Sequence, residues 1–185
     1  MFDHQAIVSA ELEAGESLLW SAQPRQGIFL RTSDKGLIPF SLLWGGFALF
    51  WEYQAISNDA PFLFVLFGLP FVIAGLYLMI GRFYYDAALR QKTFYGITNR
   101  RVIILSGIRK KQSKSIAIEE IADLNMVENA DGSGVIALGP EDVNQAQQVE
   151  MLWPGQTETK PLLSNIQDVR KPFEIIQRLR KGLTD

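Results

Sequence analysis

The sequence has no cysteine and a single histidine among its 185 residues. The absence of cysteine excludes disulfides, thiolate metal sites, iron–sulfur clusters and a cysteine nucleophile. His4 lies in an acidic N-terminal segment, so we expect neither a histidine general base nor a metal site with two histidines. The adjacent carboxylates Glu119-Glu120 and Glu141-Asp142 are typical of a solvated edge rather than an acid–base pair. We therefore expect a protein that is not an enzyme and that carries no cofactor and no metal.

Charge is scarce in the first half of the chain. Between Leu37 and Gly81 the only charged residues are Glu52 and Asp59, whereas fifteen of the eighteen lysines and arginines follow Gly81. The run from Ala60 to Gly81 has 22 residues without a charge. As a helix it would be about 33 Å long, which matches a hydrocarbon core of about 30 Å. This run predicts a transmembrane helix.

A second apolar run, from Leu37 to Trp51, reaches a spanning length only when it is extended to Ile56. Glu52 would then lie near the far interface, where its carboxylate can reach water. The two runs predict a transmembrane helical hairpin, and the alternative is a water-soluble core hairpin, which would need a polar face that these runs lack. Small residues on the expected helices suggest close packing between them. They are Ser41, Gly45 and Ala48 on the first helix and Gly68 and Gly75 on the second.

Charges that flank the hairpin predict its orientation. The link from Glu52 to Asp59 carries only negative charge, and basic residues lie outside both helices. These are Arg25, Arg31 and Lys35 before the first helix and Arg82, Arg90 and Lys92 after the second. By the positive-inside rule, both termini are expected in the cytoplasm, which predicts a multi-pass protein of the inner membrane.

The chain changes character after Thr93. Short runs rich in β-branched and aromatic residues alternate with turn signals such as Asn99-Arg100 and Pro154-Gly155. Seven strands are expected, at 93–98, 101–106, 113–118, 124–128, 134–138, 149–153 and 160–163. One amphipathic helix is expected from Asp168 to Lys181, with Gly182 as its stop. This pattern is typical of a small antiparallel barrel or sandwich.

Several motifs occur in an order that resembles the bacterial pleckstrin-homology-like domain. They are Tyr95-Gly96-Ile97-Thr98-Asn99-Arg100-Arg101-Val102-Ile103 followed by Gly107, then Ile118-Glu119-Glu120-Ile121, Asp131-Gly132-Ser133-Gly134 and Ile166-Gln167-Asp168. The resemblance covers about Phe94 to Lys181. Leu12-Glu13-Ala14-Gly15-Glu16, with Trp20 and Pro24-Arg25 ahead of two membrane helices, is similar to the layout of membrane-anchored members. The resemblance implies a PH-like seven-stranded, roughly orthogonal antiparallel β-barrel, capped by a C-terminal α-helix and used for binding rather than catalysis.

A run of basic residues without an acidic neighbour is the candidate binding site. It consists of Arg100, Arg101, Arg109, Lys110, Lys111 and Lys114, and the next acidic residue is Glu119. Beneath a membrane these charges could face anionic lipid headgroups, each contributing about 1 kcal/mol. Equally, they could solubilise an exposed hairpin. Nucleic acid is not expected as a partner, because the domain is only slightly basic and has no evident stacking platform.

Together these features predict an α+β membrane protein in three parts. Residues 1–36 form a cytoplasmic N-terminal segment, residues 37–92 the transmembrane hairpin, and residues 93–185 the PH-like domain. The expected function is an inner-membrane-anchored binding or scaffolding module that takes a protein partner or anionic lipid. The alternative is a regulatory or structural subunit of an oligomeric transport or channel assembly, because two helices alone cannot enclose a path.

Overall fold

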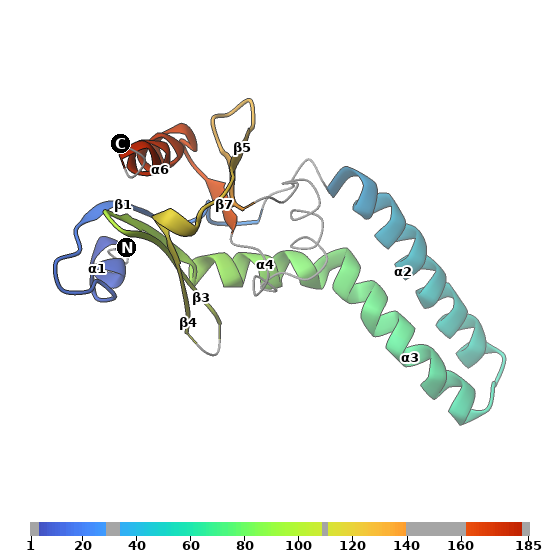
Figure 1. Ribbon diagram of the computed structural model, residues 1–185. Coiled ribbons are helices and arrows are strands. Elements are labelled where there is room, and N and C mark those ends of the chain that lie inside the picture. Colours follow the sequence, from blue (N-terminus) through green and yellow to red (C-terminus); the bar gives the residue numbers. More distant parts are fainter. Residues whose placement is uncertain (1–3, 29–33, 109–110, 140–161, 183–185) are drawn as a thin grey trace. The chain divides into compact units, whose positions relative to one another are not determined.

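The computed structural model describes residues 4–28, 34–108, 111–139 and 162–182. The chain divides into two compact units, which we describe separately. Unit 1 combines Met1–Gly27 with Asp86–Asp185, and unit 2 is Ile28–Tyr85. The first residues of the chain therefore fold with the residues that follow the apolar segment (Figure 1).

Unit 1 contains a four-stranded antiparallel sheet in the order β1-β2-β3-β4. The strands are β1 (Leu18–Ala22), β2 (Phe94–Thr98), β3 (Arg101–Ser106) and β4 (Gln112–Ala117). The last three form a meander, as expected from their turn signals. β1 comes from the N-terminal segment and pairs with β2, with Trp20 opposite Ile97.

Both faces of β2 and β3 are covered. Every residue of β2 is buried, and so are the four apolar residues 102–105 of β3. Because side chains alternate along a strand, Val102 and Ile104 enter one core while Ile103 and Leu105 face the other way. The second face packs against α1 (His4–Ser9), whose Val8 is fully buried.

A second antiparallel sheet of unit 1 has three strands among the described residues, in the order β5-β6-β7. Its strands are β5 (Leu124–Glu128), β6 (Gly134–Leu138) and β7 (Leu162–Ile166). The β5–β6 turn has Gly132 at φ +76°, a conformation that glycine adopts without steric cost. A single turn of 3₁₀ helix, η2 (Ile118–Glu120), lies between β4 and β5.

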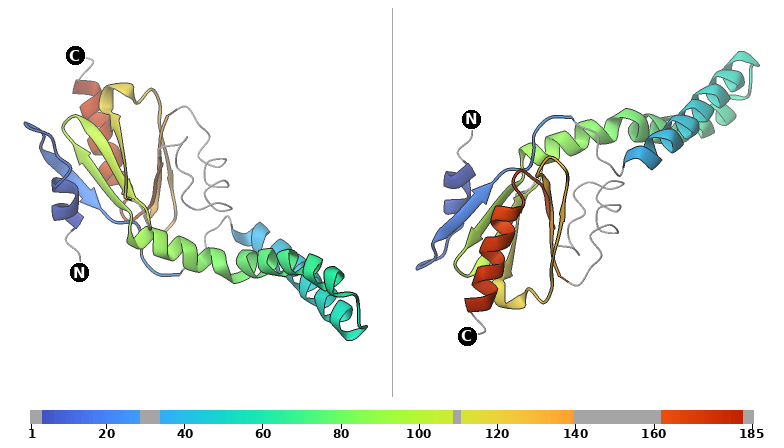
Figure 2. Two further views of the ribbon diagram at one scale, coloured as in Figure 1. Left: turned by 90° about the horizontal axis from the view of Figure 1, so that it is seen from below. Right: turned by 90° about the horizontal axis from the view of Figure 1, so that it is seen from above.

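The main core of unit 1 lies between the two sheets and beneath α6 (Arg170–Gly182). Ile97 and Val102 of the first sheet, Ile136 and Leu163 of the second, and Ile176 of α6 belong to one cluster of buried side chains. Both views in Figure 2 show α6 beside the sheets of this unit. The expected C-terminal helix is confirmed and begins two residues later than Asp168.

The prediction of a closed seven-stranded barrel is wrong. Within the described residues, the structure has two separate antiparallel sheets of four and three strands, and β4 is not paired with β5. The 3₁₀ turn and residues 121–123 separate these two strands along the chain, and β1 takes the free edge of β2. The expected strand at 149–153 lies outside the described residues, and the expected strand at 160–163 corresponds to β7.

Unit 2 consists mainly of two antiparallel helices. α2 (Asp34–Ser57) is followed by α3 (Phe62–Leu76), and the two pack along each other. Pro61 directly precedes α3, and Pro70 lies inside it without ending it. A π-helical segment, η1 (Tyr77–Gly81), leads from α3 into α4 (Arg82–Gln91), whose residues from Asp86 onward belong to unit 1.

The prediction of a two-helix transmembrane hairpin is also wrong. Among the described residues, one helix is long and apolar enough to cross a membrane, the continuous stretch Phe62–Gln91 of 30 residues. α2 is not long and apolar enough by the same measure of length and composition. One such helix is weak support for membrane association.

Candidate functional site

The predicted basic cluster is spread along the β3–β4 hairpin. Arg100 and Arg101 lie at the β2–β3 turn, at the end of the hairpin where Arg101 pairs with Ala117. Lys111 lies at the opposite end of the hairpin, directly before Gln112, which pairs with Ser106. Five residues of extended strand separate these ends by about 17 Å. Lys114 lies opposite Ile104 near the middle of the hairpin and is half-buried. Arg109 and Lys110 lie outside the described residues.

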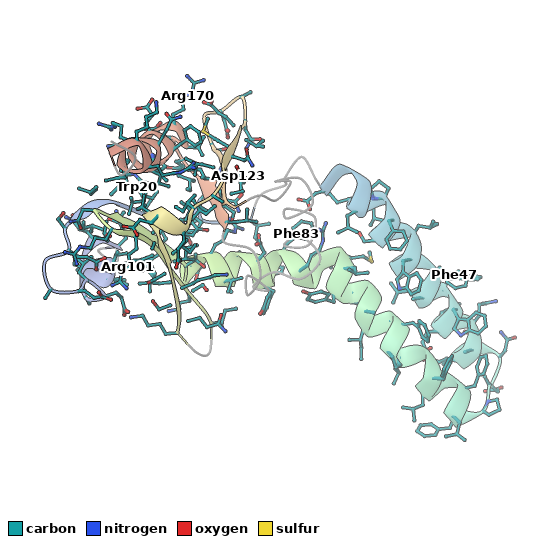
Figure 3. The ribbon with its side chains drawn as sticks, viewed as in Figure 1. Trp20, Phe47, Phe83, Arg101, Asp123 and Arg170 are labelled. Carbon is teal, nitrogen blue, oxygen red and sulfur yellow. The ribbon has the colours of Figure 1, made fainter. Side chains whose placement is uncertain are left out.

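Arg101, which is labelled in Figure 3, is bound by carboxylates of the N-terminal segment. Its Nε and Nη2 donate to the two oxygens of Glu16 at 2.8 and 2.9 Å, and its Nη1 lies 2.8 Å from Oε1 of Glu13. The Thr98 hydroxyl lies 3.1 Å from Oε1 of Glu16, and the backbone amide of Glu13 donates to Oε2 at 2.8 Å. The Glu16 side chain is only 1% exposed.

These contacts shift the ionisation of both partners. Burial by itself would raise the pKa of Glu16, but hydrogen bonds from Arg101, the Glu13 amide and Thr98 outweigh it and hold that pKa below its usual value. The hydrogen bond to Glu16 raises the pKa of Arg101, with the nearby charges of Glu16 and Glu13 adding to it. The pair is therefore fully ionised near neutral pH.

Lys111 also reaches the N-terminal segment. Its Nζ pairs with Oε1 of Glu11, and the backbone carbonyl of Glu11 accepts from Nη2 of Arg101 at 3.2 Å. Arg101 and Lys111 of the basic cluster thus meet acidic residues of the same chain. Arg100 is exposed, and binding of a ligand at this cluster stays a prediction.

Unit 2 contains a close-packed contact that we call the helix seam. Its members are Ser41, Gly45, Ala48 and Glu52 on α2 and Gly68 and Gly75 on α3, all of them buried. A Cβ atom on Gly75 would lie 2.9 Å from the Cα of Gly45, so the two backbones touch here. The close packing expected from these small residues is confirmed.

One end of the helix pair carries a buried ion pair. Nη1 of Arg82 donates to Oδ1 of Asp34 at 2.9 Å, and the two side chains are 3% and 5% exposed. Nε of Arg82 donates to the carbonyl of Leu78 at 3.0 Å, within the helix. The guanidinium also lies 4.3 Å from the centre of the Phe83 ring, a favourable cation–π distance. This pair joins the first residue of α2 to the first residue of α4.

Glu52 is the charged residue of the seam at the other end. Its side chain is buried, with 7% of the residue exposed, and neither carboxylate oxygen has a hydrogen-bond partner among the described residues. The carboxylate occupies the space beside the Gly68 backbone, because a Cβ on Gly68 would lie 1.9 Å from its Oε2. This differs from the expectation that Glu52 reaches water. An apolar environment makes a buried carboxylate without a partner costly.

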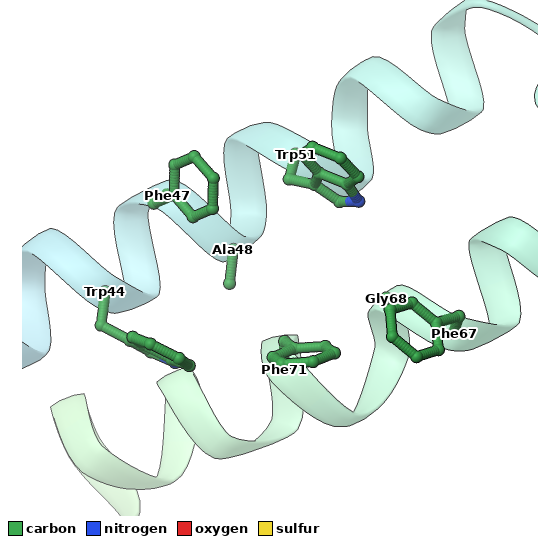
Figure 4. A pocket seen from close by; sticks show the side chains of 7 residues that line it. All are labelled: Trp44, Phe47, Ala48, Trp51, Phe67, Gly68 and Phe71. Atoms are coloured by element: carbon green, nitrogen blue, oxygen red, sulfur yellow. The ribbon is translucent and has the colours of Figure 1, made fainter.

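An aromatic groove adjoins Glu52 on the surface of the helix pair (Figure 4). It has a volume of about 230 Å³. Its walls are Trp44, Phe47, Ala48 and Trp51 of α2 and Phe67, Gly68 and Phe71 of α3. Ring contacts tie the two walls together, with 6.3 Å between the ring centres of Trp44 and Phe71. Gly68 is shared, since it lines the groove and also contacts Glu52.

Sequence reasoning missed the placement of Glu52 and the Asp34–Arg82 pair. The signal for Glu52 was present, because positions 41, 45, 48, 52 and 55 are spaced by four and three residues in alternation. That spacing follows one face of a helix packed against a partner, so Glu52 continues the stripe of small residues. No comparable signal pairs Asp34 with Arg82, which are 48 residues apart.

The chain is similar to one curated protein of Rhodobacter capsulatus. The two are 29% identical over 161 residues, covering 83% of this chain and 72% of the relative, which is described as an uncharacterized 23.7 kDa protein in the puhA 5′ region. No family model matches the chain. No solved structure matches it at a significant level.

Proposed function

We propose that the protein is a membrane-anchored binding module, held in the bilayer by the apolar helix that begins at Phe62 and presenting unit 1 to a protein partner. The observation that carries this proposal is the exposure of large apolar side chains on α3. Phe62 and Leu63 are each 76% exposed, Phe67 65% and Ile73 66%. Exposing such a surface to water costs about 25 cal/mol of free energy for each Å² of apolar area, whereas acyl chains cover it without this cost.

The strand pairing of unit 1 brings the two flanks of unit 2 together. β1 precedes α2 in the chain and β2 follows α4, and yet the two strands are hydrogen-bonded neighbours in one sheet. The segments before and after unit 2 therefore fold together in unit 1. Basic residues dominate these flanks, which favours the cytoplasmic side of an inner membrane.

A protein partner is favoured over anionic lipid for unit 1. Lipid binding by the basic cluster needs cations that are free to meet headgroups. Arg101 and Lys111 instead have carboxylate partners in the N-terminal segment.

Alkaline carbonate washing of bacterial membranes that contain the full chain tests the anchoring. We expect the chain to remain in the membrane pellet. The double variant Leu66→Arg and Ile73→Arg should move it largely to the supernatant, because each arginine in the apolar part of a spanning helix costs about 3 kcal/mol. Val127→Arg on β5 of unit 1, where the side chain is 37% exposed, is the matched control and should stay in the pellet. Release of the wild-type chain by carbonate would refute the proposal.

A further inference from the structure

Strand β4 forms an open edge of the first sheet of unit 1. It pairs with β3 on one side, and among the described residues no strand pairs with its other side (Figure 1). Gln112, Ser113 and Ser115 are exposed along it. An open edge presents backbone donors and acceptors to which another extended chain can bind. β4 therefore has the backbone groups that the addition of a strand requires.

The hydrogen bonds of the β3–β4 hairpin show which residues of β4 face the open edge. The amide of Ile118 donates to the carbonyl of Arg100 at 2.9 Å, and these two residues are directly opposite in the register of the hairpin. Hydrogen-bonded pairs alternate along an antiparallel ladder, so residues 112, 114 and 116 also direct their backbone N–H and C=O groups toward β3. Residues 113, 115 and 117 direct theirs toward the open edge.

The side chains of β4 alternate with the same period. Ser115 lies opposite Ile103, on the face of the sheet that α1 covers, and Ser113 shares that face. Lys114 lies opposite Ile104, on the other face. An added strand would therefore place one set of side chains beside the two serines and the alternate set beside Lys114.

We infer that the open edge of β4 is a docking site for an extended, acidic segment of a partner protein, which joins the sheet as a further strand. The inference rests on the proposed function and deepens it, since it names the surface of unit 1 that the protein partner meets. Strand addition is a recurring mode of peptide recognition, in which backbone hydrogen bonds supply affinity and alternate side chains supply specificity.

Charge selects an acidic segment as the occupant. The sequence has no acidic residue from Arg100 to Ile118, and the charged residue of β4 itself is Lys114. Lys114 already has an interaction within the chain, but an ammonium group has three donors and can meet a further carboxylate. Opposite charges on neighbouring strands stabilise their pairing, whereas like charges destabilise it. A second copy of β4 would bring its own lysine to the edge, so charge disfavours pairing between two copies.

Binding of short peptides to the full chain tests this site. The probe is a dye-labelled heptapeptide in which threonine and glutamate alternate, with threonine at both ends. Threonine favours extended backbone and can pair with Ser113 and Ser115, while glutamate then lies beside Lys114. Fluorescence anisotropy in micelles of a neutral detergent measures the affinity. Two control peptides carry glutamine or lysine in place of glutamate.

The charge of the peptide should set its affinity. We expect the glutamate peptide to bind about threefold more tightly than the glutamine peptide, and the lysine peptide to bind most weakly. Lys114→Gln should abolish the preference for glutamate over glutamine. Lys171→Gln removes the same charge from the exposed face of α6 and should leave that preference unchanged.

Methylation of peptide amides tests the backbone pairing. Threonine amides of the bound peptide point toward β4, because they lie opposite residues 113, 115 and 117, and glutamate amides point away. Methylating two inner threonine amides should weaken binding about tenfold, whereas methylating two glutamate amides should change it less than about twofold. Ser115→Pro removes an outward-facing amide of β4 without removing a hydrogen bond to β3, so it should abolish binding, and Ser115→Thr should retain it.

Four results would overturn the inference. They are failure of the glutamate peptide to bind, a glutamate preference that survives Lys114→Gln, equal losses from the two methylation patterns, and binding that survives Ser115→Pro. The methylation result needs no protein variant, so it stands even if a substitution impairs folding. Self-association of the chain that Ser115→Pro removes would identify a second copy as the occupant and overturn the acidic segment.

The site and the anchoring can fail separately. A chain that carbonate extracts from membranes and that still binds the glutamate peptide would overturn the anchoring and leave this site. A chain that stays in the membrane pellet but does not bind the peptide would overturn the site alone.

Discussion

Glu16 is a buried carboxylate whose charge is balanced inside unit 1. Arg101 binds both of its oxygens, and Thr98 and the Glu13 amide complete its contacts. The group connects the N-terminal segment to the β2–β3 turn through a charge-assisted hydrogen bond of the strong, bidentate kind. Its ionisation is therefore coupled to the stability of unit 1.

Glu16→Gln should destabilise unit 1 by about 2 kcal/mol at pH 7, because hydrogen bonds to charged groups contribute about that much. The pKa of Glu16 is lowered in the folded chain, so the stability it contributes is present above the unfolded-state pKa of about 4.3. That contribution is lost as the pH falls from this value through the folded-state pKa. Urea unfolding of the full chain in detergent micelles, followed by circular dichroism at a series of pH values, measures the difference from wild type.

Two comparisons isolate the contribution of Glu16 to the pH dependence of the free energy of unfolding. Asp131 also has a lowered pKa, through hydrogen bonds from Ser133, and titrates in the same direction in both proteins, so it cancels in the difference. Glu13→Gln is the control, since the Glu13 side chain is 67% exposed and its ion pair should contribute less than about 1 kcal/mol. If the difference in the free energy of unfolding between wild type and Glu16→Gln persisted unchanged at low pH, the stabilising role of the ionised Glu16 would be contradicted.

Individual basic residues were visible in the sequence, but their partners were not. The sequence shows an acidic N-terminal segment and a separate basic run, and the basic run by itself fits contact with lipid as well as it fits contact with solvent. Glu16 and Arg101 are 85 residues apart, and only the folding of both segments onto one sheet brings them together. Long-range charge pairing depends on geometry that residue types do not encode.

At the scale of elements, α2 and α3 depend on glycines that let their backbones touch. The contact between Gly45 and Gly75 involves backbone atoms that cannot rotate away, so a side chain at Gly75 must push the helices apart. Gly46, the next residue on α2, has open space where a Cβ would be. The two glycines therefore provide a matched pair of substitutions.

Gly75→Ala should destabilise the helix pair by about 1 to 3 kcal/mol, the usual cost of overpacking. Gly46→Ala should be neutral or stabilise it by up to about 1 kcal/mol, because alanine favours helices more than glycine does. Titration with a denaturing detergent, followed by the fluorescence of Trp44 and Trp51, reports on the separation, since both rings contact phenylalanines of α3. Equal effects of the two substitutions would show that the close contact does not form.

Most elements of unit 1 could be predicted because their signals are local. β2, β3, β5 and β6 match the expected strands closely, since turn residues and β-branched runs mark their limits. β1 and α1 were not predicted. The continuous apolar run of β3, residues 102–105, was the available hint, because a strand buried on both faces needs a second covering layer.

The whole chain folds into two compact units. The cores of unit 1 contain residues from before and after unit 2, and the two segments are tied at their junction. Nη2 of Arg90 donates to the carbonyl of Gly27 at 2.8 Å, and Nη1 of Arg90 contacts the carbonyl of Arg25 at 2.5 Å. The ends of unit 1 that lead into unit 2 therefore lie close together.

Unit 1 should fold without unit 2. Replacing residues 28–85 by six glycine and serine residues, which can extend about 20 Å, bridges the gap between Gly27 and Asp86. We expect a monodisperse protein in detergent-free buffer with a cooperative thermal transition. Size-exclusion chromatography and circular dichroism measure this outcome.

The matched control is the same deletion with Val8→Asp, which places a charge in the core between α1 and the first sheet. It should prevent cooperative folding, because a buried charge without a partner costs several kcal/mol. Aggregation or a lack of cooperative unfolding in the unsubstituted deletion protein would show that unit 1 needs the helices.

By itself the sequence determined where the apolar helix lies, which residues form most strands and the last helix, and which small residues bring α2 and α3 together. These features follow from hydrophobicity, turn chemistry and helical spacing, which act over a few residues. The tertiary structure alone decided that the strands form two sheets, that the N-terminal segment supplies β1, and that Glu52 is enclosed against Gly68. Strand pairing and burial arise from contacts between distant segments, so their free energy is set by the packing of the whole unit and not by any local pattern.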